Sequence, residues 1–150
     1  MRNSDNTIVQ PPFTKEMRKT HTILLPQMLP IHLYLLSKVF RQAGYRTEVL
    51  NTTHAAVTEE GLKSVHNDTC YPALLVIGQF IDALKSGKYD LDRTALLLTQ
   101  TGGGCRASNY IYLLRKALEK NGFDNIPVIS LNFSGFDSNG LKLNLRTLIK

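Results

Sequence analysis

The chain has 150 residues, of which 43% are hydrophobic and 20% charged, with no tryptophan and a net charge of +6. A chain of this length is expected to form one domain that buries about two-thirds of its unfolded surface. No apolar run reaches the roughly 18 residues of a membrane span. The N-terminal MRNSDNTIVQ lacks the apolar core of a secretory signal. The sequence therefore predicts a cytoplasmic protein with no membrane partner.

The positive charge comes from 18 lysine and arginine residues against 12 acidic ones, dispersed along the chain. No dense basic run with interleaved aromatic residues is present, which argues against a nucleic-acid partner. The excess is compatible with an anionic substrate, such as a phosphate or a thioester carboxylate, and equally with an ordinary solvated surface. Two cysteines in a reducing compartment argue against a structural disulfide, and two are too few for a four-thiolate metal site.

The first half of the chain opens on a polar segment and then alternates between strand and helix patterns. Residues 1–19 contain Pro11 and Pro12 and are expected to form a flexible lead-in to a single domain over 20–150. THTILLPQ at 20–27 is almost continuously apolar inside, which is typical of a strand covered on both faces. A helix over about 31–43 follows, opened by Pro30 and ended by Gly44. Its broad apolar face is formed by Ile31, Tyr34, Leu35, Leu36, Val39 and Phe40.

A second strand is expected at 46–51, and a short helix at 58–65. Thr58 is the expected N-cap of that helix, and Gly61 weakens it. Pro72 opens the next helix, over roughly 72–85, which Ser86 and Gly87 end. Its core side is formed by Leu74, Ile77, Ile81 and Leu84.

The clearest strand is TALLLTQ at 94–100, and a glycine-rich turn follows it. A helix is then expected over about 106–120, with Ile111, Leu114 and Leu118 facing inward and Gly122 ending it. PVISLNF at 127–133 is a further strand, and another helix is expected from 141 onward. This alternation predicts a parallel sheet covered by helices, with right-handed crossovers.

Both cysteines fall where a helix is expected to begin: Cys70 in HNDTCYP and Cys105 in TQTGGGCRASNY. A helix N-terminus presents free N–H groups and a partial positive charge, which favour the thiolate. Sites in parallel sheets lie beyond the carboxyl ends of the strands. The strand at 94–100 leads Cys105 there directly, and Cys70 arrives by a longer excursion. We therefore expect two thiolates at one end of the sheet that could hold a metal or a cluster.

The residues around Cys105 leave a ligand-facing loop and a tight structural turn both open. Gly102, Gly103 and Gly104 allow a positive φ and a close approach to a ligand, and their N–H groups could form an anion nest. The turn matches neither a Walker A loop nor a GxGxxG fingerprint. Arg106 and Asn109, in the first turn of the next helix, could hydrogen-bond a bound group or a cluster sulfide. Surface capping explains these two side chains almost as well.

Two hypotheses that make Cys105 a catalytic nucleophile have less support from the sequence than the ligand-facing loop or the structural turn. Phosphatase chemistry requires an arginine six residues on to hold the phosphate, and Ile111 occupies that position. A Cys–His hydrolase would use His66 as its base, with only Asp68 to orient it. His66 is also a candidate metal ligand or proton donor, whereas turn formation explains its polar neighbours.

Three stretches of the chain resemble the 2-hydroxyacyl-CoA dehydratase superfamily, in the branch of large proteins related to the dehydratase activator (CoA-substrate-specific enzyme activase). They are FTKEMRKTHTILLPQMLPIH, GLKSVHNDTCYPALLVIGQFIDALKSGKYD and TALLLTQTGGGCRASNYIYLLRKAL, within roughly residues 12–133. The motifs HNDxCYPA and TQTGGGCRAxNY are long enough to be specific.

The resemblance implies an iron–sulfur protein built on a Rossmann-like or flavodoxin-like three-layer α/β domain, here with a mostly parallel sheet of about four strands. Dehydratase subunits of this superfamily hold a [4Fe–4S] cluster through three cysteines. An ATP-hydrolysing activator injects one electron, which the cluster-bearing component uses for radical dehydration of a 2-hydroxyacyl-CoA. By position, Cys70 and Cys105 match the motif cysteines and would be cluster ligands.

The chain also departs from the family pattern. Members of this branch are far longer, and both a third cysteine and the ATP-binding domain of the activator are missing from this sequence. The resemblance therefore implies a fragment or one piece of a split protein that is not catalytic alone. Its expected partners are the other domains or subunits of a dehydratase–activator system, an acyl-CoA and a second copy of the chain. Two other classes stay open: a cofactor-free docking domain for a cluster-bearing partner, and a CoA- or phosphate-binding α/β module.

Overall fold

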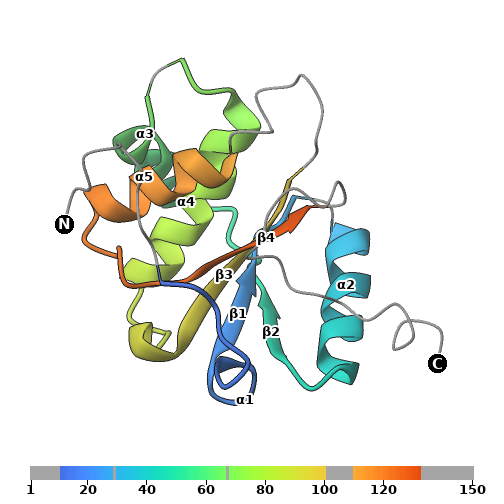
Figure 1. Cartoon of the computed structure of the whole chain (residues 1–150). Coiled ribbons are helices and arrows are strands. Elements are labelled where there is room, and N and C mark those ends of the chain that lie inside the picture. Colours follow the sequence, from blue (N-terminus) through green and yellow to red (C-terminus); the bar gives the residue numbers. More distant parts are fainter. Residues whose placement is uncertain (1–10, 29, 67, 101–109, 133–150) are drawn as a thin grey trace.

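The computed structural model describes residues 11–28, 30–66, 68–100 and 110–132. Strands and helices alternate through most of this range (Figure 1). The elements in chain order are α1 (Met17–Thr20), β1 (Thr22–Leu25), α2 (Pro30–Gln42), β2 (Arg46–Val49), α3 (Ala55–Ser64), α4 (Tyr71–Lys85), the 3₁₀ helix η1 (Leu91–Arg93), β3 (Thr94–Gln100), α5 (Tyr110–Lys120) and β4 (Val128–Asn132).

The four strands form one parallel sheet in the order β2-β1-β3-β4. Helix α2 covers one face, and α3, α4 and α5 lie on the other (Figure 1). This is a three-layer α/β fold of the Rossmann-like or flavodoxin-like kind, as expected. The chain reverses its direction of travel across the sheet between β1 and β3, which is where such sheets form their ligand crevice.

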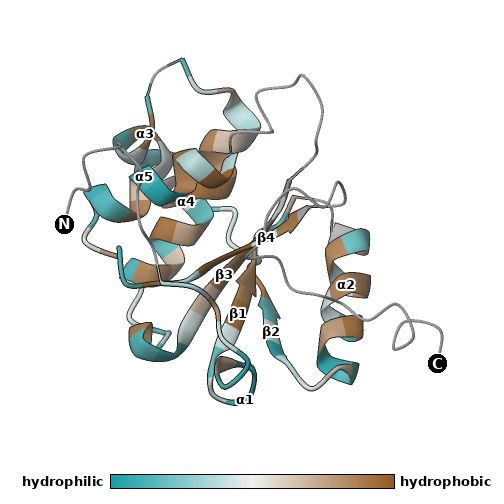
Figure 2. Cartoon of the chain, viewed as in Figure 1, coloured by the Kyte–Doolittle hydropathy of each residue, from teal (hydrophilic) through white to brown (hydrophobic). Residues whose placement is uncertain are grey.

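Two apolar clusters, one on each face, account for the continuous apolar strands. Leu24, Leu96 and Leu98 pack in the cluster that contains α4 and α5, whereas Ile23 and Leu97 pack with α2. All five side chains are fully buried. Figure 2 shows hydrophobic residues along β1 and β3, between helices α2 and α4, which also carry hydrophobic residues. The strand patterns at 20–27 and 94–100 are thus confirmed, and their alternate residues serve opposite faces.

The expected helix ends and core faces are largely confirmed. Gly44 and Gly122 follow their helices with φ of 83° and 77°, the left-handed conformation that glycine adopts without strain. The predicted core residues of α4 and α5 are buried: Leu74, Ile77, Ile81, Leu84, Ile111, Leu114 and Leu118. The helix expected from 141 onward lies outside the described residues.

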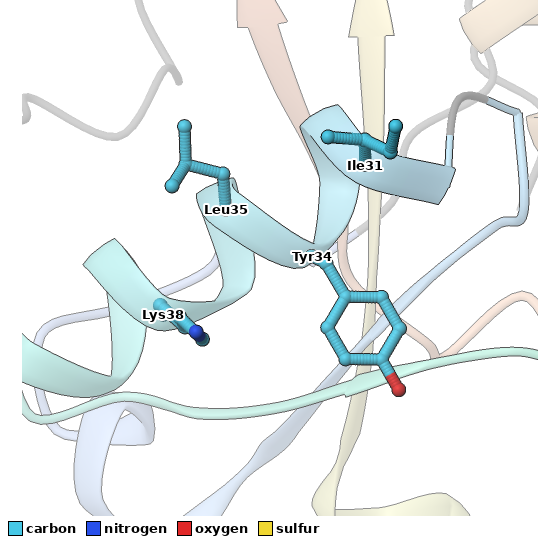
Figure 3. Close-up of a pocket in the computed structure, with 4 residues that line it drawn as sticks. All are labelled: Ile31, Tyr34, Leu35 and Lys38. Atoms are coloured by element: carbon cyan, nitrogen blue, oxygen red, sulfur yellow. The ribbon is translucent and has the colours of Figure 1, made fainter.

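The expected broad apolar face of α2 is not buried as a whole. Ile31, Tyr34 and Leu35 are 82%, 55% and 65% exposed, and Figure 3 shows these side chains on the helix together with Lys38. The buried side carries Leu33, Phe40 and the polar Ser37.

A polar contact with the edge strand explains this rotation of α2. The Ser37 hydroxyl lies 2.8 Å from the Thr47 hydroxyl on β2, and the Arg41 guanidinium donates to the Thr47 carbonyl. Both polar side chains point at β2, so they turn Ile31 and Leu35 away from the sheet. Burying a hydroxyl is tolerated because it is hydrogen-bonded.

Helix α3 begins earlier than expected. It runs from Ala55 with His54 as its N-cap, so the prediction of Thr58 as the cap is wrong. Gly61 and Gly78 lie at the contact between α3 and α4: a Cβ on Gly61 would lie 2.5 Å from the Leu74 carbonyl oxygen, and one on Gly78 would overlap the Val57 carbonyl oxygen. Gly61 therefore permits a close helix crossing, at the expense of helix propensity.

The segment before β1 also contacts the domain where it is described. Phe13 packs against the cluster on the α2 face, and the Arg18 guanidinium lies 4.8 Å from the centre of the Tyr45 ring. Among the helices of the described ranges, none combines the length and apolarity needed to cross a membrane.

Candidate functional site

The N-terminus of α4 lies at the carboxyl end of the sheet. Helix α4 leads into β3 and all strands are parallel, so α4 must run back from the carboxyl edge to the amino edge. Strand β3 then ends at Gln100, directly before the segment 101–109. Cys70, at the start of α4, and Gln100, at the end of β3, therefore lie at the same edge of the sheet, which is where sites of this fold class form.

Cys70 is the N-cap residue of α4. Its backbone is extended, with φ −62° and ψ 145°, and its carbonyl accepts the first helical hydrogen bond, from Leu74 at 3.1 Å. The sulfur makes no capping bond to the helix. The side chain is half-buried and packs against the α4–α5 core cluster. The Cys70 sulfur is thus held at a helix N-terminus, where backbone N–H groups favour negative charge.

The sulfur of Cys70 lies 3.3 Å from the hydroxyl oxygen of Tyr110. Tyr110 is the first residue of α5 and the last residue of TQTGGGCRASNY, and it is 6% exposed. The two residues are 40 positions apart in the chain. This contact joins the Cys70 motif to the end of the Cys105 motif, although Cys105 lies outside the described residues.

Of the other predicted ligand-binding residues, the structure describes only His66. His66 lies on the loop before α4, with Nδ1 3.8 Å from a carboxylate oxygen of Asp68 in a pair that is largely solvent-exposed. The His66 carbonyl accepts from the Thr69 N–H at 3.0 Å, as expected of a turn. The predicted site residues outside the described ranges are Gly102, Gly103, Gly104, Cys105, Arg106 and Asn109.

Gln79 organises the carboxyl edge and was missed by the sequence analysis. This residue of α4 is 6% exposed. Its side-chain oxygen accepts from the Gln27 N–H at 2.8 Å, and its amide donates to the Thr52 carbonyl at 3.2 Å. Gln79 thereby fixes the segments that follow β1 and β2 against α4. The available signal was one amide within the apolar run ALLVIGQFIDAL.

Two buried oxygens at this edge have no hydrogen-bond partner among the residues that the structure describes. They are Oε1 of Gln27 and Oγ1 of Thr52, which belong to the two segments fixed by Gln79. A buried polar atom without a partner is costly and calls for an explanation. Both atoms lie beyond the carboxyl ends of their strands, so they are the polar groups that a ligand at this edge could satisfy.

A groove of about 520 Å³ runs between the end of α3 and one side of α5. It is lined by Ser64, Val65, His66, Tyr112, Leu113, Lys116, Glu119 and Lys120. Lys120 also donates to the carbonyl of Lys63, which links the two helices. The groove offers an aromatic ring and cationic side chains beside the Cys70 loop.

A second pocket, of about 380 Å³, lies beside the edge strand β2 and does not include Cys70. Here one Glu48 oxygen accepts from Lys88 at 2.6 Å and from Tyr89 at 2.7 Å. Burial by itself raises the pKa of Glu48, but these two hydrogen bonds outweigh it and lower the pKa. Burial, followed by the hydrogen bond to Glu48, raises the pKa of Tyr89. The carboxylate is satisfied by these partners, so this arrangement is a structural link between β2 and the segment that follows α4.

The fit to an iron–sulfur cluster rests on one described ligand. In the part of the chain that the structure describes, no group of three or more His, Cys, Asp or Glu side chains could hold a metal ion. Cys70 supplies a sulfur at a helix N-terminus, turned toward a hydroxyl group. This donor chemistry suits one position of a cluster that other segments or chains would complete.

Comparison of the chain with known protein families, curated proteins and solved structures gives no match.

Proposed function

We propose that this chain is an iron–sulfur cluster-binding domain of the 2-hydroxyacyl-CoA dehydratase superfamily, taking part in electron transfer for radical dehydration of an acyl-CoA. The observation that carries the proposal is the 3.3 Å contact between Cys70 and Tyr110, because it joins the two motifs on which the resemblance depends. Only five positions separate Tyr110 from Cys105 in the sequence.

In this proposal, Cys70 and Cys105 are two of the cluster ligands, and another chain or segment supplies the third. The cluster, when bound, supplies one-electron chemistry. The N-terminus of α4 stabilises the negative charge of the ligated sulfur, and the packing of Cys70 against the core limits access of water. The partners are the other subunits of a dehydratase–activator system, an acyl-CoA and a second copy of the chain. The proposed location is the cytoplasm, where thiols stay reduced.

Anaerobic reconstitution with iron and sulfide tests the proposal. We expect a visible charge-transfer band and bound iron and sulfide, both lost in Cys70→Ser and in Cys105→Ser. His66→Asn is the matched control in the same loop as Cys70. Circular dichroism must show that each variant is folded. A folded wild-type chain that binds neither iron nor sulfide would contradict the proposal.

A cofactor-free docking domain is the second candidate, and the outward face of α2 is the observation that favours it. Ile31, Tyr34 and Leu35 form an exposed apolar group with Lys38, lining a depression of about 390 Å³ (Figure 3). Exposed apolar groups of this kind often mark a partner surface. The occupant would be the cluster-bearing subunit.

The docking hypothesis predicts that the chain binds no iron. It also predicts that the Leu35→Lys variant no longer associates with the cluster-bearing subunit. Leu62→Lys is the matched control, because Leu62 on α3 is similarly exposed, at 54% against 65%. Unchanged association of the Leu35→Lys variant would contradict docking through α2.

A further inference from the structure

We infer that Tyr110 is a positioning residue, whose phenolic O–H donates a hydrogen bond to the Cys70 sulfur and holds that sulfur in place as a ligand. The inference rests on the proposed function, in which Cys70 is a cluster ligand. Tyr110 is the last residue of the Cys105 motif, but it is not one of the proposed cluster ligands.

The direction of the hydrogen bond follows from the chemistry of the two groups. At 3.3 Å, either the thiol or the phenol could be the donor while Cys70 keeps its proton. A thiolate, or a sulfur bound to iron, has no proton to give. Tyr110 is then the only possible donor of the pair.

The surroundings of Tyr110 hold its hydroxyl in place. The ring is 6% exposed and belongs to the same core cluster as Ile111 and Leu114. The Cys70 backbone is fixed by its place at the start of α4. The Cys70 sulfur is a hydrogen-bond partner of this buried hydroxyl, and a buried polar group is stabilised by such a bond. Tyr110 and Cys70 are therefore held together from two different helices.

A hydrogen bond to a ligated sulfur has a defined electronic consequence. It draws negative charge away from the metal–sulfur unit, which makes reduction easier and raises the potential of a cluster. Tyr110 therefore sets the orientation of the Cys70 sulfur. Through that sulfur it also raises the reduction potential of the bound cluster.

The first test uses the chain without iron. In a Cys105→Ser background, Cys70 carries the only thiol of the chain, so the infrared S–H band reports on this one group. We expect Tyr110→Phe, which keeps the ring and removes the hydroxyl, to shift that band. Tyr112→Phe is the matched control, since Tyr112 lies two positions on and is 45% exposed. An unshifted band in a folded Tyr110→Phe variant would overturn the inference.

The second test uses the reconstituted chain. We expect Tyr110→Phe to bind the wild-type amount of iron with a more negative midpoint potential, and Tyr112→Phe to keep the wild-type potential. An unchanged potential in Tyr110→Phe would overturn the inference and leave the proposed function standing. Failure of the wild-type chain to bind iron would overturn the proposed function, and the infrared test would still decide whether the two groups interact.

Discussion

At the scale of single residues, the carboxyl edge of the sheet is organised by polar side chains within apolar surroundings. Gln79 joins α4 to the segments after β1 and β2, and Tyr110 joins α5 to the Cys70 loop. Each is 6% exposed. A buried polar side chain fixes the relative position of the segments that it joins, because its hydrogen bonds require one geometry. Apolar contacts tolerate small shifts.

Replacing Gln79 with methionine should lower the free energy of unfolding by about 2–4 kcal/mol. Methionine has a similar volume, so the loss reflects the Gln27 N–H and the Thr52 carbonyl, which lose the Gln79 amide as their partner. Urea unfolding measures the difference. Gln42→Met, at an exposed position of α2, should change stability by less than about 0.5 kcal/mol. Equal midpoints for the two variants would contradict the role of Gln79.

At the scale of elements, α3 and α4 approach each other closely, because two glycines leave room for the opposing backbones. Gly61 faces Leu74, and Gly78 faces the carbonyl of Val57. Interiors are densely packed, and a main-chain carbonyl cannot move aside as the end of a flexible side chain can. The spacing of the two helices is therefore set by backbone contact.

Gly78→Ala should destabilise the protein by more than about 2 kcal/mol, because the added methyl group meets the Val57 carbonyl. Helix propensity alone predicts the opposite sign, a gain of about 1 kcal/mol. Chemical denaturation gives both the sign and the size. Leu62→Ala, on the exposed side of α3, should have little effect. A stabilised Gly78→Ala variant would show that the two helices can separate without cost.

The same pair of helices is joined by a charged contact that should respond to pH. Lys85 on α4 donates to Glu60 on α3 at 2.6 Å, and this hydrogen bond lowers the pKa of Glu60 below its ordinary value of 4.5. A depressed carboxyl pKa contributes stability above the unfolded value, and that contribution is lost as the pH falls through the folded pKa.

Glu60→Gln should therefore cost about 0.3–1 kcal/mol at pH 7 and less at pH 3, because the contribution of Glu60 declines as the pH falls through its folded pKa. Unfolding curves at the two pH values, for the wild type and the variant, measure the change. Glu59→Gln is the control, because the ion pair of Glu59 within the described ranges is an exposed contact of 3.9 Å with Lys63. A stability difference that stays constant between the two pH values would argue against a depressed pKa in Glu60.

At the scale of the whole molecule, the strand order divides the sheet into a centre and two edges. β1 and β3 are the inner strands, and β2 and β4 flank them. The inner strands have hydrogen-bonded neighbours on both sides and fully buried side chains at Ile23, Leu24, Leu96 and Leu97. They should open only when the whole domain unfolds.

Native-state hydrogen exchange should find the slowest amides in β1 and β3, with free energies of opening close to that of global unfolding. Amides of β2 should exchange faster, because this strand is at the edge of the sheet formed by the described strands and pairs there with β1 alone. Mass spectrometry of peptides from each strand can resolve the difference. Equal protection of β2 and β3 would mean that another segment covers the β2 edge.

The patterns that predicted the fold correctly were local. Apolar strands with alternate residues on two faces, such as Ile23 and Leu24, require helices on both sides of the sheet. Positive φ at Gly44 and Gly122 ends the helices because few other residues adopt it without strain. The position of Cys70 at a helix start was also predictable, from Pro72 after it and polar residues before it.

The features that the sequence analysis missed depend on partners far along the chain. The apolar residues of α2 allow more than one inward side, and Ser37 and Arg41 select one only because Thr47 is present on β2. In the same way, Gly61 weakens an isolated helix but permits close packing against α4. Within the candidate site, the lone amide of Gln79 in an apolar run was the only local signal for that residue, and its partners at Gln27 and Thr52 could not be identified from the sequence.

The sequence by itself thus determined which segments form strands and helices, where most helices end and that the strands are parallel, because short-range propensity and periodicity control these features. Tertiary structure alone decided the rotation of α2, the crossing of α3 with α4 and the meeting of Cys70 with Tyr110 across 40 positions. Each of these depends on hydrogen bonds or steric contacts between distant residues, whose energies do not exist until the chain has folded.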